Sequence, residues 1–97
     1  METKFLSHFV NLSCVSNCQV FNIEAEMLYY SSDKYNKHRV YVNGDKDLSV
    51  DGYCLICKTN SEALAVFNKL LRKELITACE LIDMGFLTYQ QLNQKEE

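Results

Sequence analysis

The chain has 97 residues, 47% hydrophobic and 24% charged, which predicts one globular domain over residues 1–97. Ten basic and thirteen acidic residues give a formal net charge of −3. This charge disfavours a basic protein that wraps nucleic acid, and it is too mild for a polyanionic mimic of DNA. No apolar stretch approaches the ~18 residues of a membrane span, and no secretion signal is readable, so no membrane contact is expected.

The cysteines bear on both compartment and metal binding. There are five of them: Cys14, Cys18, Cys54, Cys57 and Cys79. An odd number without a secretion signal predicts reduced thiols in a cytoplasm, the host cytoplasm if the protein is viral. The first four supply the ligand count of a structural zinc site. On a continuous strand, however, Cys54 and Cys57 face opposite sides of the sheet, so we expect free thiols and no metal or cofactor; the four-cysteine zinc site is the alternative.

Two segments in the first third of the chain are predicted to be strands. Residues 4–12 suit a strand, although Phe5, Phe9 and Leu12 would also line one side of a helix. Residues 19–30 alternate between apolar and polar side chains, which is the pattern of a strand with one buried face. The apolar positions of that segment are Phe21, Ile23, Ala25, Met27 and Tyr29.

Two further strands are predicted in the middle of the chain. Residues 38–43 form the first, and the turn signal Asn43-Gly44 follows it. In residues 48–58 apolar side chains recur on one side of an extended chain, so this segment is predicted to be the second strand. Gly52 interrupts this last segment, either as a bulge or as part of a tight turn between two shorter strands.

A long helix is predicted over residues 60–83. Thr59 and Glu62 have the spacing of a capping box before it, and Gly85 provides a stop after it. Six residues recur at helical spacing as an apolar stripe: Leu64, Phe67, Leu71, Leu75, Ala78 and Ile82. From this stripe we expect Leu71 to be among the most buried side chains.

A second capping box, Thr88 with Gln91, predicts a short helix over residues 88–93. The predicted fold class is therefore α+β. An antiparallel sheet of three to five strands carries the long helix on one face, with the short helix at the C-terminal end.

The segment 29–41 is the most informative candidate surface, because tyrosines and basic side chains alternate along it. Tyrosine with arginine is the composition of energetically dominant residues in protein interfaces. The same mixture suits nucleic acid, where bases stack on rings and cations meet phosphates, but the negative net charge makes that partner the less favoured one. The predicted partner-binding residues are Tyr30, Lys34, Tyr35, Lys37, His38, Arg39 and Tyr41.

A contact between two copies of the chain is a second possibility. Val66 and Ile76 fall on the outer face of the predicted long helix, where an apolar contact between two copies would form a homodimer.

Catalytic motifs are missing from the sequence: there is no nucleophile elbow, phosphate-binding glycine loop, zinc-protease motif or dinucleotide signature. We therefore predict a protein that is not an enzyme. In size, in this lack of signatures and in its asparagine-, lysine- and tyrosine-rich composition, the chain resembles small phage or mobile-element proteins that block host machinery, including inhibitors of the anti-CRISPR type. The resemblance concerns organisation and assigns no site residue. It implies an inhibitor that acts by steric occupation of a host (defence) protein; the alternative is a small nucleic-acid-binding or regulatory protein.

Overall fold

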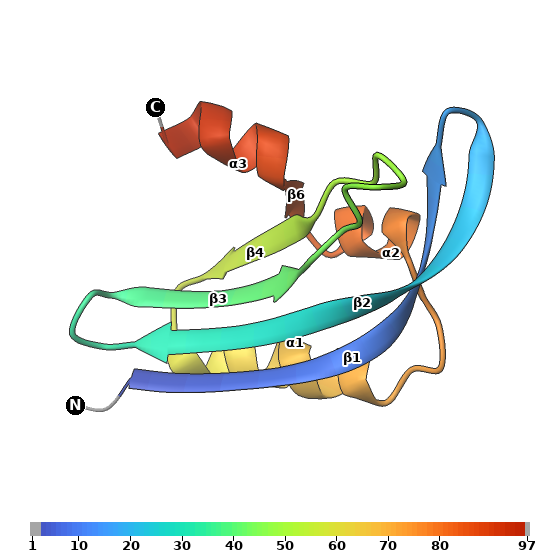
Figure 1. Ribbon diagram of the computed structural model, residues 1–97. Coiled ribbons are helices and arrows are strands. Elements are labelled where there is room, and N and C mark those ends of the chain that lie inside the picture. Colours follow the sequence, from blue (N-terminus) through green and yellow to red (C-terminus); the bar gives the residue numbers. More distant parts are fainter. Residues whose placement is uncertain (1–2, 97) are drawn as a thin grey trace.

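A computed structural model describes residues 3–96, which form one six-stranded sheet and three short helices (Figure 1). The strands are β1 (Thr3–Ser16), β2 (Gln19–Ser32), β3 (Lys37–Val42), β4 (Tyr53–Cys57), β5 (Ile76–Thr77) and β6 (Leu87–Thr88). The helices are α1 (Asn60–Leu71), α2 (Ala78–Asp83) and α3 (Tyr89–Glu96). The order in the sheet is β5-β1-β2-β3-β4-β6. The predicted α+β class is confirmed. The predicted sheet of three to five antiparallel strands is wrong in detail, because β5 and β6 extend it and β5 runs parallel to β1.

The N-terminal half of the sheet is a long hairpin of β1 and β2. Both predicted strands, 4–12 and 19–30, are confirmed and are longer than expected. The hairpin turns at Asn17 and Cys18, whose φ angles of 52° and 65° belong to the left-handed region. Two such residues match the type I′ turn, whose twist fits the twist of the two strands. The turn therefore fixes the register of β1 on β2 from its closing pair, Ser16 with Gln19.

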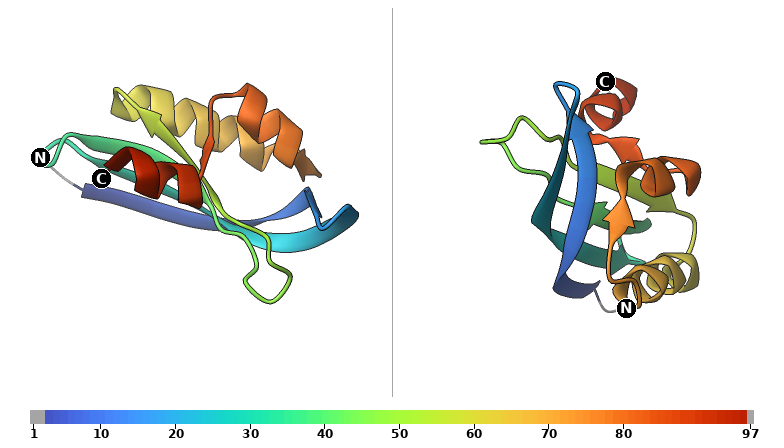
Figure 2. Two further views of the ribbon diagram at one scale, coloured as in Figure 1. Left: turned by 90° about the horizontal axis from the view of Figure 1, so that it is seen from above. Right: turned by 90° about the vertical axis from the view of Figure 1, so that its right-hand side faces the viewer.

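The alternating side chains of the strands give the sheet a buried inner face. The strand residues buried on that face include Val10, Leu12, Ile23, Ala25, Met27, Tyr29, Val40, Val42 and Tyr53. Helix α1 covers this face over β2, β3 and β4, and the Tyr29 and Phe67 rings meet with their centroids 5.8 Å apart. Figure 2 shows α1 and α2 on this side of the curled sheet. The main core lies between the sheet and these two helices.

The predicted strand 48–58 is wrong in its first half. Residues before β4 form a small hairpin turn in which the backbones of Asp45 and Val50 exchange two hydrogen bonds of 2.9 Å. The carboxylate of Asp45 also accepts from the backbone N–H of Asp47 at 2.9 Å, which is the local bonding by which aspartate favours turns over strands. Gly44 allows this turn to close, because a Cβ there would overlap the backbone of Val50 and Asp51. The turn that Gly44 and the aspartates form therefore takes the place of the first half of the predicted strand.

The predicted helix 60–83 is also wrong, because the chain leaves the helix after Leu71 and begins a new one at Ala78. Thr77 and Glu80 form a capping box: the threonine hydroxyl accepts from the Glu80 N–H at 3.2 Å, and the Glu80 carboxylate accepts from the Thr77 N–H at 3.4 Å. Between the helices, Ile76 pairs with Leu12 of β1. The second cap and this strand pairing replace helical hydrogen bonds in the middle of the predicted element.

The break changes which side chains of this region are buried. Leu75 and Ile82, which the predicted stripe placed in the core, are 45% and 56% exposed, and Leu71 is half-buried. The buried residues are instead Ala63, Leu70 and Leu81, which lie outside the predicted stripe, together with Phe67, which belongs to it. Ile76 is fully buried in β5, so its predicted place on the outer face of a long helix is wrong and it offers no surface to a second copy.

The C-terminal end behaves largely as predicted. Helix α2 stops before Gly85, whose φ of +102° is the conformation that glycine adopts most readily. The capping box of Thr88 and Gln91 is confirmed, with bonds of 3.0 and 3.1 Å, and it starts α3 one residue later than predicted. Helix α3 packs beside the outer face of the sheet (Figure 2). The Tyr89 ring meets the Tyr41 ring there.

Candidate functional site: the outer face of the sheet

Strand parity divides the seven predicted contact residues into three groups. Tyr30, Arg39 and Tyr41 point to the outer face, opposite to Tyr29 and Val40. Three of the other residues lie at the turn between β2 and β3, and the fourth, His38, is buried. The exposed residues at the turn are Lys34, Tyr35 and Lys37.

His38 is the buried exception, since only 5% of it is exposed. Its Nδ1 lies 2.7 Å from the hydroxyl of Ser31, and its Nε2 lies 3.8 Å from the carboxylate of Asp33. Both neighbours belong to the end of β2 and the start of the turn. His38 therefore holds the β2–β3 turn together and does not contribute to an exposed contact surface.

Four outer-face side chains stand in one line across four strands. The pairing places Phe5 of β1 opposite Tyr30 of β2, Tyr30 opposite Arg39 of β3, and Arg39 opposite Ile56 of β4. Phe5 and Ile56 are 59% and 45% exposed, and Tyr30 and Arg39 are half-buried between them. We call these four residues the cross-strand row. It combines two apolar ends with a central tyrosine and arginine on a rigid sheet.

Neighbouring residues hold Arg39 in place within the row. Its Nη1 donates to the hydroxyl of Tyr41 at 3.5 Å. The Tyr41 ring in turn meets the Tyr89 ring edge to face, with centroids 6.3 Å apart and planes at 67°. A guanidinium fixed in this way loses less conformational entropy on binding than one on a free side chain. Helix α3 thus contributes to the site through its first residue.

Tyr89 is anchored at the border of the row by two hydrogen bonds. Its hydroxyl donates to Oδ1 of Asn43 at 2.5 Å, and its backbone N–H donates to the carbonyl of Gly52 at 2.9 Å. Gly52 is needed for this approach, because a Cβ there would overlap the Tyr89 ring. Tyr89 also lines an open groove of about 350 Å³ with Leu28, Tyr41, Asn43, Leu92 and Asn93. The groove extends the candidate surface beyond the row towards α3.

Tyr89 should make stability depend on pH in the alkaline range. Burial raises the pKa of Tyr89 well above its usual 10.0, and the nearby Cys54 and Tyr41 groups add to the effect. The unfolded chain therefore loses this proton first, so the stabilisation is complete below pH ~10 and falls as the pH rises further. Urea unfolding at neutral pH and at pH ~11 measures how much the free energy of unfolding falls between the two. We expect this fall to be smaller for Tyr89→Phe than for the unmodified protein. Tyr35→Phe, at an exposed position, should lose as much as the unmodified protein; equal losses for all three proteins would contradict the assignment.

The four thiols of the alternative zinc site are spread over the molecule. Cys54 is buried on the outer side of β4 and Cys57 is half-buried on the inner side, as their parity predicted. Cys14 is buried on the inner face of β1, while Cys18 lies exposed at the hairpin turn. Burial raises the pKa of both Cys14 and Cys57, with a further contribution from Glu62 at Cys57. Within residues 3–96 no three histidine, cysteine or acidic side chains are grouped as metal ligands.

Sequence reasoning found the centre of the cross-strand row and missed its ends. Tyr30 and Arg39 belong to the conspicuous segment 29–41, whereas Phe5 and Ile56 lie far from it in the sequence and join it only through strand register. An exposed Phe5 on a predicted strand was the one available signal, and it was ambiguous because the same residues also suited a helix.

No protein-family model matches the chain, no curated protein is similar to it in sequence, and no solved structure matches its fold. Among the helices that the structure describes, none has both the length and the apolar character needed to cross a membrane.

Proposed function

We propose that this protein is a non-enzymatic protein-interaction module that binds a partner protein through the cross-strand row. The observation that carries the proposal is the alignment of Phe5, Tyr30, Arg39 and Ile56 across four strands. Aromatic and arginine side chains at the centre of a contact, flanked by apolar ones, are the usual source of binding energy in protein interfaces. A sheet presents them without a loop that must become ordered on binding.

The charges near the row favour a partner surface that combines apolar and acidic groups. Arg39 lies in the row, and the exposed Lys34 and Lys37 lie at the adjoining β2–β3 turn. Such complementarity speeds association and selects among partners. By occupying a surface of its partner the protein would block it sterically, which is the mode of action of the small phage and mobile-element inhibitors that the chain resembles.

Nucleic acid is the second candidate. The rings of Phe5, Phe9 and Tyr30 lie on one open sheet face, where bases of single-stranded RNA stack in some RNA-binding domains. The carboxylates of Glu24 and Glu26 lie on the same face and would repel phosphates. A complex whose affinity falls steeply with added salt and disappears after nuclease treatment would favour nucleic acid over protein.

The test begins with affinity capture from a nuclease-treated lysate of a plausible host, followed by binding measurements on the captured protein. We expect Arg39→Ala and Ile56→Ala each to weaken binding by more than ~1 kcal/mol, about fivefold or more in Kd, because each removes part of the row. Melting temperatures should change little for Ile56→Ala, since Ile56 is already 45% exposed.

Val20→Ala is the matched control. Val20 is a branched aliphatic residue that is 71% exposed on the same strand pair, but it lies at the far tip of the β1–β2 hairpin. Its substitution should leave the affinity unchanged. A partner that binds Arg39→Ala and Ile56→Ala as tightly as the unmodified protein would place the contact surface elsewhere.

A further inference from the structure

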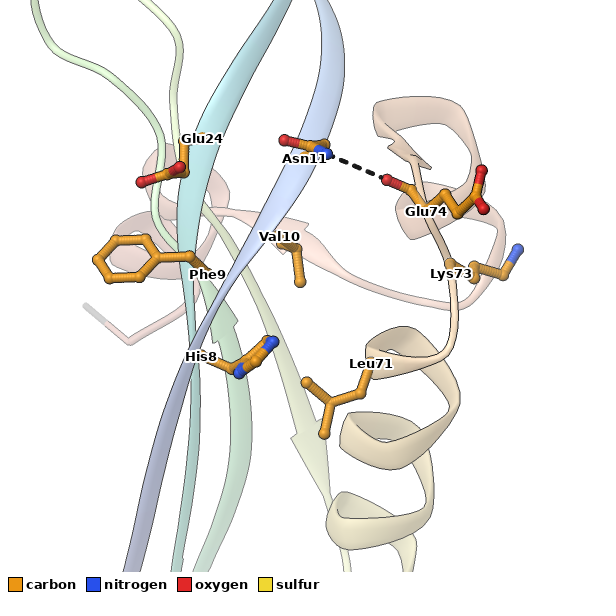
Figure 3. A pocket seen from close by; sticks show the side chains of 8 residues that line it. All are labelled: His8, Phe9, Val10, Asn11, Glu24, Leu71, Lys73 and Glu74. Carbon is orange, nitrogen blue, oxygen red and sulfur yellow. Dashed lines mark hydrogen bonds between the residues drawn. The ribbon is translucent and has the colours of Figure 1, made fainter.

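The outer edge of β1 is open over most of its length. Within the described part of the chain, β2 pairs with β1 from Thr3 to Ser16 on one side, whereas β5 pairs on the other side only at Leu12 and Ser13. At Asn11 the side chain amide donates to the carbonyl of Glu74 at 3.3 Å, as the chain approaches β5 (Figure 3). The edge from Thr3 to Val10 has no described strand beside it, as Figure 1 also shows.

Backbone donors and acceptors on this edge can be assigned from the neighbouring strand. The Asn43 N–H donates to the carbonyl of Glu26, so the backbone of Glu26 faces β3. Phe9 lies opposite Glu26 and therefore belongs to a pair without direct hydrogen bonds, which turns its own N–H and C=O away from β2. By alternation, Phe5 and Ser7 also direct their backbone groups to the open edge.

The edge has only one of the features that usually prevent strands from pairing with other chains, a lysine near its N-terminal end. Proline and inward-pointing charges are the common protections, and the chain has no proline. Lys4 is the one lysine, arginine or acidic residue between Thr3 and Val10. Phe5 and Phe9 stand beside the edge on the outer face, 59% and 60% exposed.

We propose that β1 pairs with β1 of a second copy of this chain, antiparallel about a two-fold axis at Ser7. The side chains of β1 are symmetric about this residue, because Phe5 and Phe9 lie at equal distances on either side of it and on the same face. The pairing therefore places Phe5 of each copy opposite Phe9 of the other, with the small Ser7 opposite itself. Aromatic cross-strand pairs stabilise sheets, and here one residue pattern supplies two of them.

Other registers that use the same backbone groups lose this match. A shift of the axis to Leu6 places Phe5 opposite Ser7 and leaves Phe9 opposite Thr3. A shift to His8 leaves Phe5 opposite Asn11, at the position where Glu74 already lies against β1. The axis at Ser7 is the register that forms both aromatic pairs, and its added strand reaches this segment only with Thr3, its first described residue, which lies opposite Asn11.

The inner side of the same edge fits this occupant as well. An open groove of about 540 Å³ runs between β1 and the end of α1, where His8 and Leu71 face each other (Figure 3). In the proposed register Lys4 of the second copy lies opposite Val10, beside the groove that Glu74 lines. Leu6, which is 48% exposed in a single chain, becomes covered by His8 of the second copy.

The proposed dimer shares Phe5 with the cross-strand row, so it is tested on the purified chain alone, where no other partner is present. Analytical ultracentrifugation of the purified chain is the direct test, and we expect its mass to rise to that of a dimer with increasing concentration. Phe5→Ala removes both aromatic pairs at once and should weaken the dimer about tenfold. Ser7→Lys places two lysines opposite each other and should also weaken it, whereas Asn22→Lys, on an exposed position of β2, should not.

A charge exchange tests the register itself. In the doubly substituted Phe5→Lys, Phe9→Glu chain every lysine faces a glutamate of the second copy, so it should dimerise more tightly than either like-charged control. One control is the double variant Phe5→Lys with Phe9→Lys, and the other is the double variant Phe5→Glu with Phe9→Glu. The net charge of the lysine–glutamate chain lies between those of the two controls. A chain that stays monomeric at every concentration, or three double variants of equal dimer affinity, would overturn the proposal.

Discussion

Replacing Leu70 with alanine is expected to lower the free energy of unfolding by about 2–5 kcal/mol, because the side chain is fully buried between α1 and the inner face of the sheet. Leu71→Ala removes the same atoms from the next position of the helix. Leu71 is half-buried and borders the open groove, so the space it vacates is filled by water and the loss should be less than half as large. Urea unfolding of both variants measures the difference.

This pair distinguishes the observed helix from the predicted one. The long helix 60–83 would make Leu71 the more costly substitution, since it lies at the centre of the predicted stripe. Equal losses, or a larger loss for Leu71→Ala, would show that the helix is rotated relative to the described packing.

Gly44→Ala should have the second large effect, a loss of about 3 kcal/mol from steric overlap. A Cβ at this position meets the carbonyl of Val50 and the backbone of Asp51, and backbone atoms cannot move aside as a flexible side chain would. The turn must open instead, which breaks the two backbone bonds between Asp45 and Val50. Thermal unfolding followed by circular dichroism would measure the loss.

Gly85→Ala is the control for this substitution. At Gly85 an added Cβ meets only a side chain atom of Leu55, at an ordinary 3.5 Å, and the cost arises from the positive φ alone. That strain amounts to about 1 kcal/mol. If Gly44→Ala proved no more destabilising than Gly85→Ala, the close contact of the two turn segments would be disproved.

The parts of the fold that sequence patterns predict correctly are those stabilised by interactions between residues close together in the sequence. Alternation identified β2 because nearly every second side chain of it is buried, and the capping residues Thr59 and Thr88 marked real helix starts. The break after Leu71 could have been read from Thr77 and Glu80, which have the same capping spacing. The apolar residues on either side of the break hide it, because they continue a helical period by coincidence.

Other parts depend on contacts between distant segments and have no local signal. Strands β5 and β6 are two residues long each and exist only because they lie beside β1 and β4. The cross-strand row has the same origin: the sequence indicates Tyr30 and Arg39, but only the register of four strands brings Phe5 and Ile56 beside them. His38 is the opposite case. Its neighbours in the sequence suggest an exposed surface, but its position on β3 places its side chain on the buried face.

The placement of β5 and β6 has a consequence for how the chain is made. Strand β5 pairs with two residues on one side of the sheet and β6 with two on the other, although only nine residues separate Thr77 from Leu87 in the sequence. During synthesis the first four strands emerge well before this segment, so a nascent chain lacks both of these pairings until residues 76–88 have left the ribosome. Domains emerging from the ribosome fold as units, and unpaired strands are prone to aggregation in the interval. Completion of the sheet is therefore tied to residues 76–88, and a chain truncated before them would leave backbone groups unpaired on β4 and at Leu12 and Ser13 of β1.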